Sequence, residues 1–80
     1  MTVHSQKDFD ARVEYAHILA VEDIAHFHLE TDPAAIERMA VELEAKPEAF
    51  DEGPEMALLV VSALRLEAAR LIQQKDLVAA

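Results

Sequence analysis

Apolar residues recur at three- and four-residue steps from residue 9 to residue 27, which is the spacing of one face of an α-helix. Ser5 precedes this stripe and suits an N-cap, with Asp8 three residues later as a weak capping box. The pattern therefore predicts a first helix from about Gln6 to about Leu29. Its apolar stripe consists of Phe9, Val13, Ala16, Ala20, Ile24 and Phe27.

A second helix is predicted over residues 33–45. Asp32 is a good N-cap residue, and Pro33 suits the first helical position, where its missing N–H costs nothing. Pro47 disfavours helical angles at the residue before it and so ends the helix. The residues expected to face the core are Ile36, Met39, Ala40 and Leu43.

Residues 47–53 form a connector with room for one helical turn, and Phe50 is expected to pack back on the core. Gly53 and Pro54 restart the chain, and a third helix is predicted over residues 54–77. Its main apolar stripe is Ala57, Val60, Val61, Leu64, Ala68, Leu71 and Ile72, and a second stripe beside it is Met56, Leu59, Ala63 and Leu66.

These elements predict an all-α fold, a single small three-helix domain over residues 1–80 in which two long helices flank a short one. At about 1.5 Å per residue, the long helices exceed about 30 Å and the short one spans about 20 Å. The short helix therefore leaves apolar surface uncovered, and completion by a homodimer is expected. The alternative is that the long helices bend or are shorter than predicted, so that the monomer closes by itself.

Composition limits the chemistry that the chain can support. The sequence contains no cysteine, which excludes disulfides and thiolate metal sites. The polar start of the sequence does not resemble a secretory signal. The longest apolar run, residues 56–61, is far shorter than the roughly 20 residues needed to cross a bilayer. A cytoplasmic location and no contact with a membrane are therefore expected.

Negative charge is concentrated in the middle of the chain. The formal net charge is −9, and residues 30–55 hold nine acidic residues and two basic ones. Phosphate contacts require clusters of lysine and arginine, so direct binding to nucleic acid is not expected. Binding to an anionic membrane is disfavoured for the same reason.

Candidate catalytic and metal-binding groups are few, and no enzymatic activity and no cofactor are expected. Ser5 is explained as a cap, and no nucleophile-elbow motif surrounds Ser62. Glu14 and His17 have the i, i+3 spacing that helical di-iron sites use, but such sites need further glutamates from other helices. A metal site at Glu14 and His17, completed by a second copy of the chain, is therefore a remote third hypothesis. The simpler interpretation of the histidines is solvated positions on the first helix.

The favoured hypothesis is a non-enzymatic interaction protein that binds and blocks or modulates a basic, nucleic-acid-binding protein. A strongly negative surface steers association with a basic one and matches a phosphate backbone in sign. The chain is similar, in size and charge only, to phage or plasmid anti-defence inhibitors, antitoxin-type partners and accessory adaptors. The residues predicted to bind the partner are Glu42, Glu44, Glu48, Asp51, Glu52 and Glu55, and the predicted apolar anchor or oligomer contact is Met56, Leu59 and Leu66, with Leu58 beside them.

Two simpler interpretations of the same residues stay open. The acidic residues are also what a solvated helix face needs for solubility alone. In that case the chain is a self-assembling structural or adaptor protein, and the apolar run from Met56 enters the core or a dimer contact. Acidic residues at the start of the third helix are also favoured by the helix dipole.

Overall fold

The computed structural model of the chain describes residues 2–79, with side chains described for residues 8–74. It contains the helices α1 (Thr2–His26), α2 (Pro33–Ala45) and α3 (Pro54–Ala79), and a short 3-10 helix, η1 (Pro47–Ala49). No β-strand occurs between residues 2 and 79. The predicted all-α, three-helix fold is therefore confirmed.

The outer ends of the two long helices differ from the prediction. Helix α1 begins at Thr2 rather than about Gln6, so Ser5 lies inside the helix and the prediction that it is the N-cap is wrong. No proline or glycine interrupts residues 2–5, so nothing in the backbone forces a later start. Helix α3 continues to Ala79 rather than ending at about Leu77.

Helix α1 ends earlier than predicted because its last turn closes in a Schellman motif. The Leu29 N–H donates to the Ile24 carbonyl at 2.8 Å, and the His28 N–H donates to the Ala25 carbonyl at 3.2 Å. His28 adopts the left-handed conformation, with φ of 57°, which reverses the chain direction. His28 was predicted to lie on the first helix, and this prediction is wrong because the helix stops at His26.

The boundaries of α2 agree with the prediction. The Asp32 side chain accepts a hydrogen bond from the Ala35 N–H at 3.1 Å, and Pro33 occupies the first helical position. Lys46, which precedes Pro47, leaves the helical region and ends the helix. The connector makes the single helical turn that was expected, and the partly buried Phe50 packs against the core.

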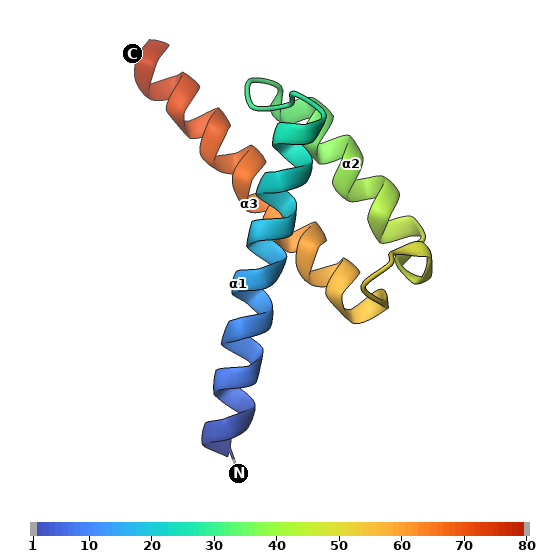
Figure 1. Cartoon of the computed structure of the whole chain (residues 1–80). Coiled ribbons are helices and arrows are strands. Elements are labelled where there is room, and N and C mark those ends of the chain that lie inside the picture. The colour runs from blue at the N-terminus through green and yellow to red at the C-terminus, as the bar shows by residue number, and fades with distance from the viewer. Residues whose placement is uncertain (1, 80) are drawn as a thin grey trace.

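Helices α1 and α3 cross near their middles, and α2 lies in one of the four angles that the crossing makes (Figure 1). Both α1 and α2 pack against α3, so the third helix, not the short one, holds the globule together. Helix α2 occupies the angle between the C-terminal half of α1 and the N-terminal half of α3. The other halves of these two helices extend beyond it, which makes the globule 48 × 28 × 19 Å in extent.

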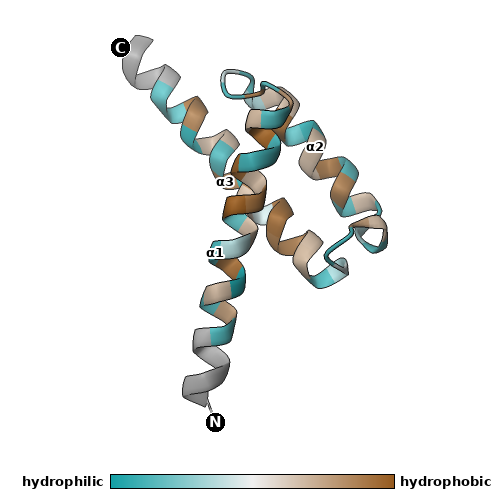
Figure 2. Ribbon diagram, in the orientation of Figure 1, coloured by the Kyte–Doolittle hydropathy of each residue, from teal (hydrophilic) through white to brown (hydrophobic). Residues whose placement is uncertain are grey.

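Small residues dominate the core, which lies around the crossing and under α2 (Figure 2). More than half of the buried apolar residues are alanines, which allow helix axes to approach closely but fill little volume. All of them belong to the predicted stripes. They are Ala16, Ala20, Ile24, Ile36, Ala40, Ala57, Val60, Val61, Ala63, Leu64 and Ala68.

The ends of the predicted stripes stay uncovered, with Phe9 and Phe27 both more than half exposed. The accessible surface of the chain is 5860 Å², against about 4800 Å² for a typical folded monomer of 8.9 kDa. Its radius of gyration is 13.9 Å, against about 11.6 Å for a typical domain of this length. The single chain thus exposes more surface than a typical monomer of its mass and leaves the ends of its apolar stripes uncovered. The homodimer itself stays a prediction.

Candidate interaction surfaces

The crossing of α1 and α3 leaves three angles that α2 does not fill, and each contains a shallow surface hollow. Two hollows lie beside the N-terminal half of α1. The apolar groove is lined on the α3 side by residues 59–66, and the Arg12–Glu55 hollow by residues 52–59. The third, the Glu67 hollow, lies between the C-terminal halves of both helices. The hollows differ sharply in chemistry.

The apolar groove has a volume of about 210 Å³. Its α1 wall is made by Phe9, Val13 and His17. Its α3 wall is made by Leu59, Ser62, Ala63 and Leu66. Leu66 is 66% exposed although it is a large apolar residue in the middle of a helix. No acidic or lysine or arginine side chain lines this groove.

The Arg12–Glu55 hollow is polar and lies next to contacts that α1 makes with the end of the connector and the start of α3. Arg12 pairs with Glu55 at 3.4 Å, and the Tyr15 hydroxyl donates to Glu52 at 3.2 Å. The hydrogen bond to Glu52, followed by the negative charge of that carboxylate, raises the pKa of Tyr15 above its ordinary value. Met56 and Leu59 supply the apolar part of the lining.

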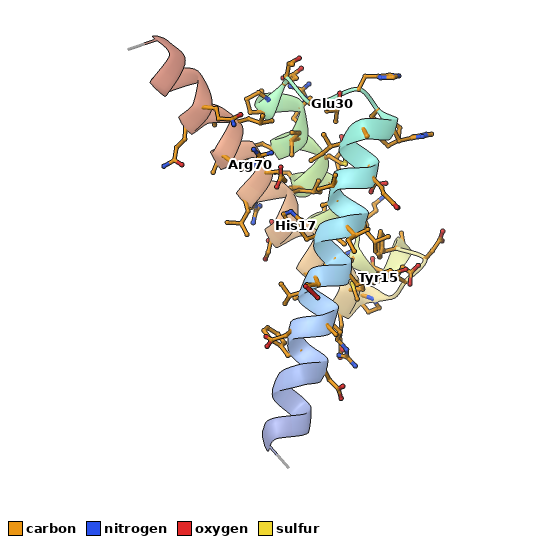
Figure 3. All side chains as sticks on the ribbon, turned by 60° about the vertical axis from the view of Figure 1, so that its left-hand side comes forward. Tyr15, His17, Glu30 and Arg70 are labelled. Atoms are coloured by element: carbon orange, nitrogen blue, oxygen red, sulfur yellow. The ribbon has the colours of Figure 1, made fainter. Side chains whose placement is uncertain are left out.

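The Glu67 hollow contains the one buried charged residue among those whose side chains are described. The Glu67 carboxylate accepts a hydrogen bond from Arg70 at 2.7 Å and lies 3.2 Å from Nε2 of His17. Figure 3 shows His17 and Arg70 in the space between α1 and α3, with Tyr15 on the other flank of α1. The hydrogen bond that Arg70 donates to Glu67 raises the pKa of Arg70, so the guanidinium stays charged.

Glu67 was not singled out from the sequence, although a signal for it was present. It lies in phase with the apolar stripe of α3, three residues after Leu64 and four before Leu71. A carboxylate at such a position is buried by the fold and requires cationic partners from its neighbours. Arg70 supplies one from the next turn, and His17 supplies another contact from α1.

The two candidate metal ligands, Glu14 and His17, have different surroundings in the structure. His17 lies against Glu67 of α3, while Glu14 is exposed on α1. Between residues 8 and 74 no group of three or more histidine, aspartate or glutamate side chains is arranged to hold a metal ion. The hypothesis of a site at Glu14 and His17 requires a second copy of the chain and stays a prediction.

The six acidic residues predicted to bind a partner follow the end of α2, η1 and the start of α3, and all are exposed. We call this set the acidic edge: Glu42, Glu44, Glu48, Asp51, Glu52 and Glu55. Three of the six already have partners within the chain. Arg65 makes two hydrogen bonds to Glu44, at 2.7 and 3.4 Å, and Glu55 and Glu52 contact Arg12 and Tyr15. Glu42, Glu48 and Asp51 have no ion pair with any described side chain.

The predicted apolar anchor is divided between two hollows. Met56 and Leu59 lie beside Glu52 and Glu55 in the Arg12–Glu55 hollow, so the structure brings part of the anchor next to part of the acidic edge. Leu59 also lines the apolar groove, together with Leu66. The anchor is therefore not one patch, and Leu66 belongs to a surface without acidic lining residues.

Comparisons with protein-family models, with curated proteins and with solved structures find no match to this chain. Along residues 2–79, none of the helices combines the length and the apolar character needed to cross a membrane.

Proposed function

We propose that the chain is a non-enzymatic interaction protein that binds a basic surface of another protein through the acidic edge. The observation that carries the proposal is that all nine acidic residues of segment 30–55 are exposed, whereas the segment itself supplies only two basic residues, Arg38 and Lys46. Exposed like charges on neighbouring elements create a field that raises the rate of encounter with a surface of opposite charge.

A nucleic-acid-binding protein is the class of partner that fits this field best. Such a protein presents clustered lysine and arginine side chains that neutralise phosphates. An acidic edge that occupies this cluster competes with nucleic acid and so blocks or modulates its partner. The proposal places both proteins in the cytoplasm.

The contacts within the described part of the chain divide the acidic edge into residues that already have a partner and residues that are free to pair with another protein. Glu44, Glu52 and Glu55 already contact Arg65, Tyr15 and Arg12 within the chain. Glu42, Glu48 and Asp51 have no cation to give up, and a basic partner gains most by pairing with them. Met56 and Leu59 supply a small apolar contact beside the charged one.

The proposal is tested by recovering partners from the native host with the tagged chain at low salt. A triple variant, Glu42→Lys, Glu48→Lys and Asp51→Lys, is expected to lose the partner, with an association rate lowered by on the order of tenfold or more. The matched control is Asp8→Lys, Glu14→Lys and Glu22→Lys, which changes the net charge equally at exposed positions of α1. Added DNA is expected to displace the chain from its partner.

Two results would count against this function. Equal loss of binding in the two triple variants would mean that only the total charge matters. Binding that persists unchanged in high salt would mean that the contact is not electrostatic, because exposed charge pairs are screened within about 10 Å at 0.1 M ionic strength.

The second candidate is a self-assembling helical protein whose acidic residues serve solubility alone. The excess of exposed surface over that of a typical monomer favours self-association. The proposed self-association surface and the proposed partner surface share Leu59, which lines both the apolar groove and the Arg12–Glu55 hollow, and otherwise use different side chains.

A further inference from the structure

We propose that the apolar groove is a self-docking surface, and that its occupant is the same groove of a second copy of this chain related by a two-fold axis. The inference goes beyond the binding of a basic partner and does not depend on it. It names the face through which the predicted homodimer forms, which the sequence pattern alone did not distinguish from the other apolar positions.

The exposed area of the chain matches what a dimer needs. The accessible surface of 5860 Å² exceeds the value for a typical monomer of this mass by about 1000 Å². A specific protein interface of standard size buries about 800 Å² from each partner. The excess, taken over the whole chain, is of the same order as the area that one protomer covers in an ordinary two-fold interface.

The groove is poorly suited to binding a small molecule. Its volume of about 210 Å³ is below the roughly 300–1000 Å³ of ordinary small-molecule sites. No aspartate, glutamate, lysine or arginine side chain lines it to orient a polar ligand, and its one histidine, His17, lies 3.2 Å from Glu67. A shallow apolar notch with large side chains on its rim is better matched by another protein surface.

Charge favours a second copy at this face over the other faces of the chain. Two molecules that each carry a net charge of −9 repel wherever their acidic residues approach. The groove is lined by no carboxylate, while the acidic edge follows the end of α2, η1 and the start of α3, to the right of α1 in Figure 1. Two copies can therefore meet through their grooves while their densest negative charges point away from each other.

A two-fold interface brings the same patch of both protomers together, so a self-docking groove needs an apolar side chain on each of its walls. Phe9 on the α1 wall and Leu66 on the α3 wall are 55% and 66% exposed, and they stand on opposite sides of the notch. A two-fold axis through the groove places Leu66 of each protomer against the Phe9 wall of its partner. The paired halves of α1 and α3 then form a four-helix arrangement around a shared apolar core.

Such a dimer leaves two acidic edges exposed on its outer sides. A partner with two basic surfaces, or an oligomeric partner, would then be bound at two points, and the second contact would form at high effective concentration. The groove would thus add to the strength of partner binding without touching the partner.

The mass of the full chain in solution, measured by light scattering and sedimentation over a wide range of concentration, tests the inference. The wild type is expected to have twice the monomer mass. Leu66→Glu and Phe9→Glu are expected to raise the dissociation constant about 30-fold or more, the effect of losing a central anchor residue. Both residues are more than half exposed, so the helical circular dichroism of the variants is expected to stay unchanged.

Val41→Glu is the matched control, because Val41 is 56% exposed but lies on α2, outside the groove. It is expected to leave the dimer intact. A second measurement uses the lack of native cysteine: a short bismaleimide linker should join two chains of a Ser62→Cys variant, and should not join two chains of a Val41→Cys variant.

A wild-type chain that is monomeric at every concentration would overturn the inference, as would groove variants that remain dimeric or a control that dissociates with them. The outcome is separable from that of the proposed function. The triple charge reversal at Glu42, Glu48 and Asp51 is expected to leave the dimer intact, and monomeric Leu66→Glu is expected still to bind a basic partner, more weakly.

Discussion

The angle filled by α2 and the angle that holds the apolar groove are built from the same two helices. Apolar side chains are buried in the first angle and exposed in the second. In the filled angle, Ile36 of α2 and Leu64 of α3 have no exposed surface. In the apolar groove, Phe9 and Leu66 are more than half exposed. Apolar residues occur at helical spacing in both angles. Periodicity in the sequence therefore identifies which residues share a helix face. Whether those residues are buried depends on whether another element packs against that face.

The largest difference between the two angles is expected when one apolar side chain is shortened in each. Ile36→Ala removes a fully buried side chain and is expected to destabilise the fold by about 2–5 kcal/mol. Leu66→Ala is expected to change the stability of the isolated chain by no more than about 0.5 kcal/mol. Urea unfolding at low protein concentration, where a dimer dissociates, measures both. Equal losses would mean that the groove is covered within one chain.

The Glu67 hollow is intermediate between the two angles, because it buries a charge instead of an apolar side chain. Arg70→Met is expected to cost about 1–3 kcal/mol, since it leaves a carboxylate that is only 11% exposed without its shortest hydrogen bond. Glu67→Gln is expected to cost less, because Arg70 is 57% exposed and water can solvate it. Thermal unfolding of the two variants gives the order. The reverse order would show that the cation, not the carboxylate, is the group that depends on the pair.

A smaller effect is expected when α2 is loosened from the angle that it fills. Asp32→Ala removes the side-chain hydrogen bond to the Ala35 N–H and is expected to cost about 1 kcal/mol. Hydrogen exchange is expected to accelerate most in the first turn of α2. The control, Asp32→Asn, retains a capping oxygen and is expected to exchange nearly as the wild type does. Uniform acceleration over all helices would mean that α2 does not open separately.

The smallest expected effect concerns Asp23, on the half of α1 that extends to the filled angle. Burial raises the pKa of the Asp23 carboxyl, an effect that His26 opposes and Glu22 assists. A raised pKa in the folded state means that the charged form costs stability above the pKa of the unfolded chain. Asp23→Asn is therefore expected to stabilise the chain at neutral pH, by no more than about 0.5 kcal/mol. The gain should vanish in acid, below the unfolded pKa, and a gain that persists there would contradict this cause.

The helices could be predicted well wherever a single residue decides the backbone. Asp32, Pro33 and Pro47 fixed the limits of α2, because a cap and two prolines allow few alternatives. The start of α1 was missed because Ser5 is equally compatible with a helix interior. Its end was missed because the Schellman turn uses His28 in the left-handed conformation, where glycine is the usual signal.

The candidate surfaces could be predicted only in part, because they depend on how helices cross. The sequence identified the exposed acidic residues, and their exposure follows from their positions between the apolar stripes. It did not show that Arg12, Tyr15 and Arg65 would engage three of them, since those contacts join residues 21 to 43 positions apart. The same limit applies to the groove, whose two walls come from separate helices.

The alanines at the crossing of α1 and α3 have a consequence for how the chain responds to dilution. A methyl group removes little apolar area from water, so a core built on Ala16, Ala20, Ala63 and Ala68 contributes less free energy than a leucine core of equal length. For a chain that pairs through the groove, mass action then supplies part of what the interior lacks. Its melting temperature would then rise with protein concentration.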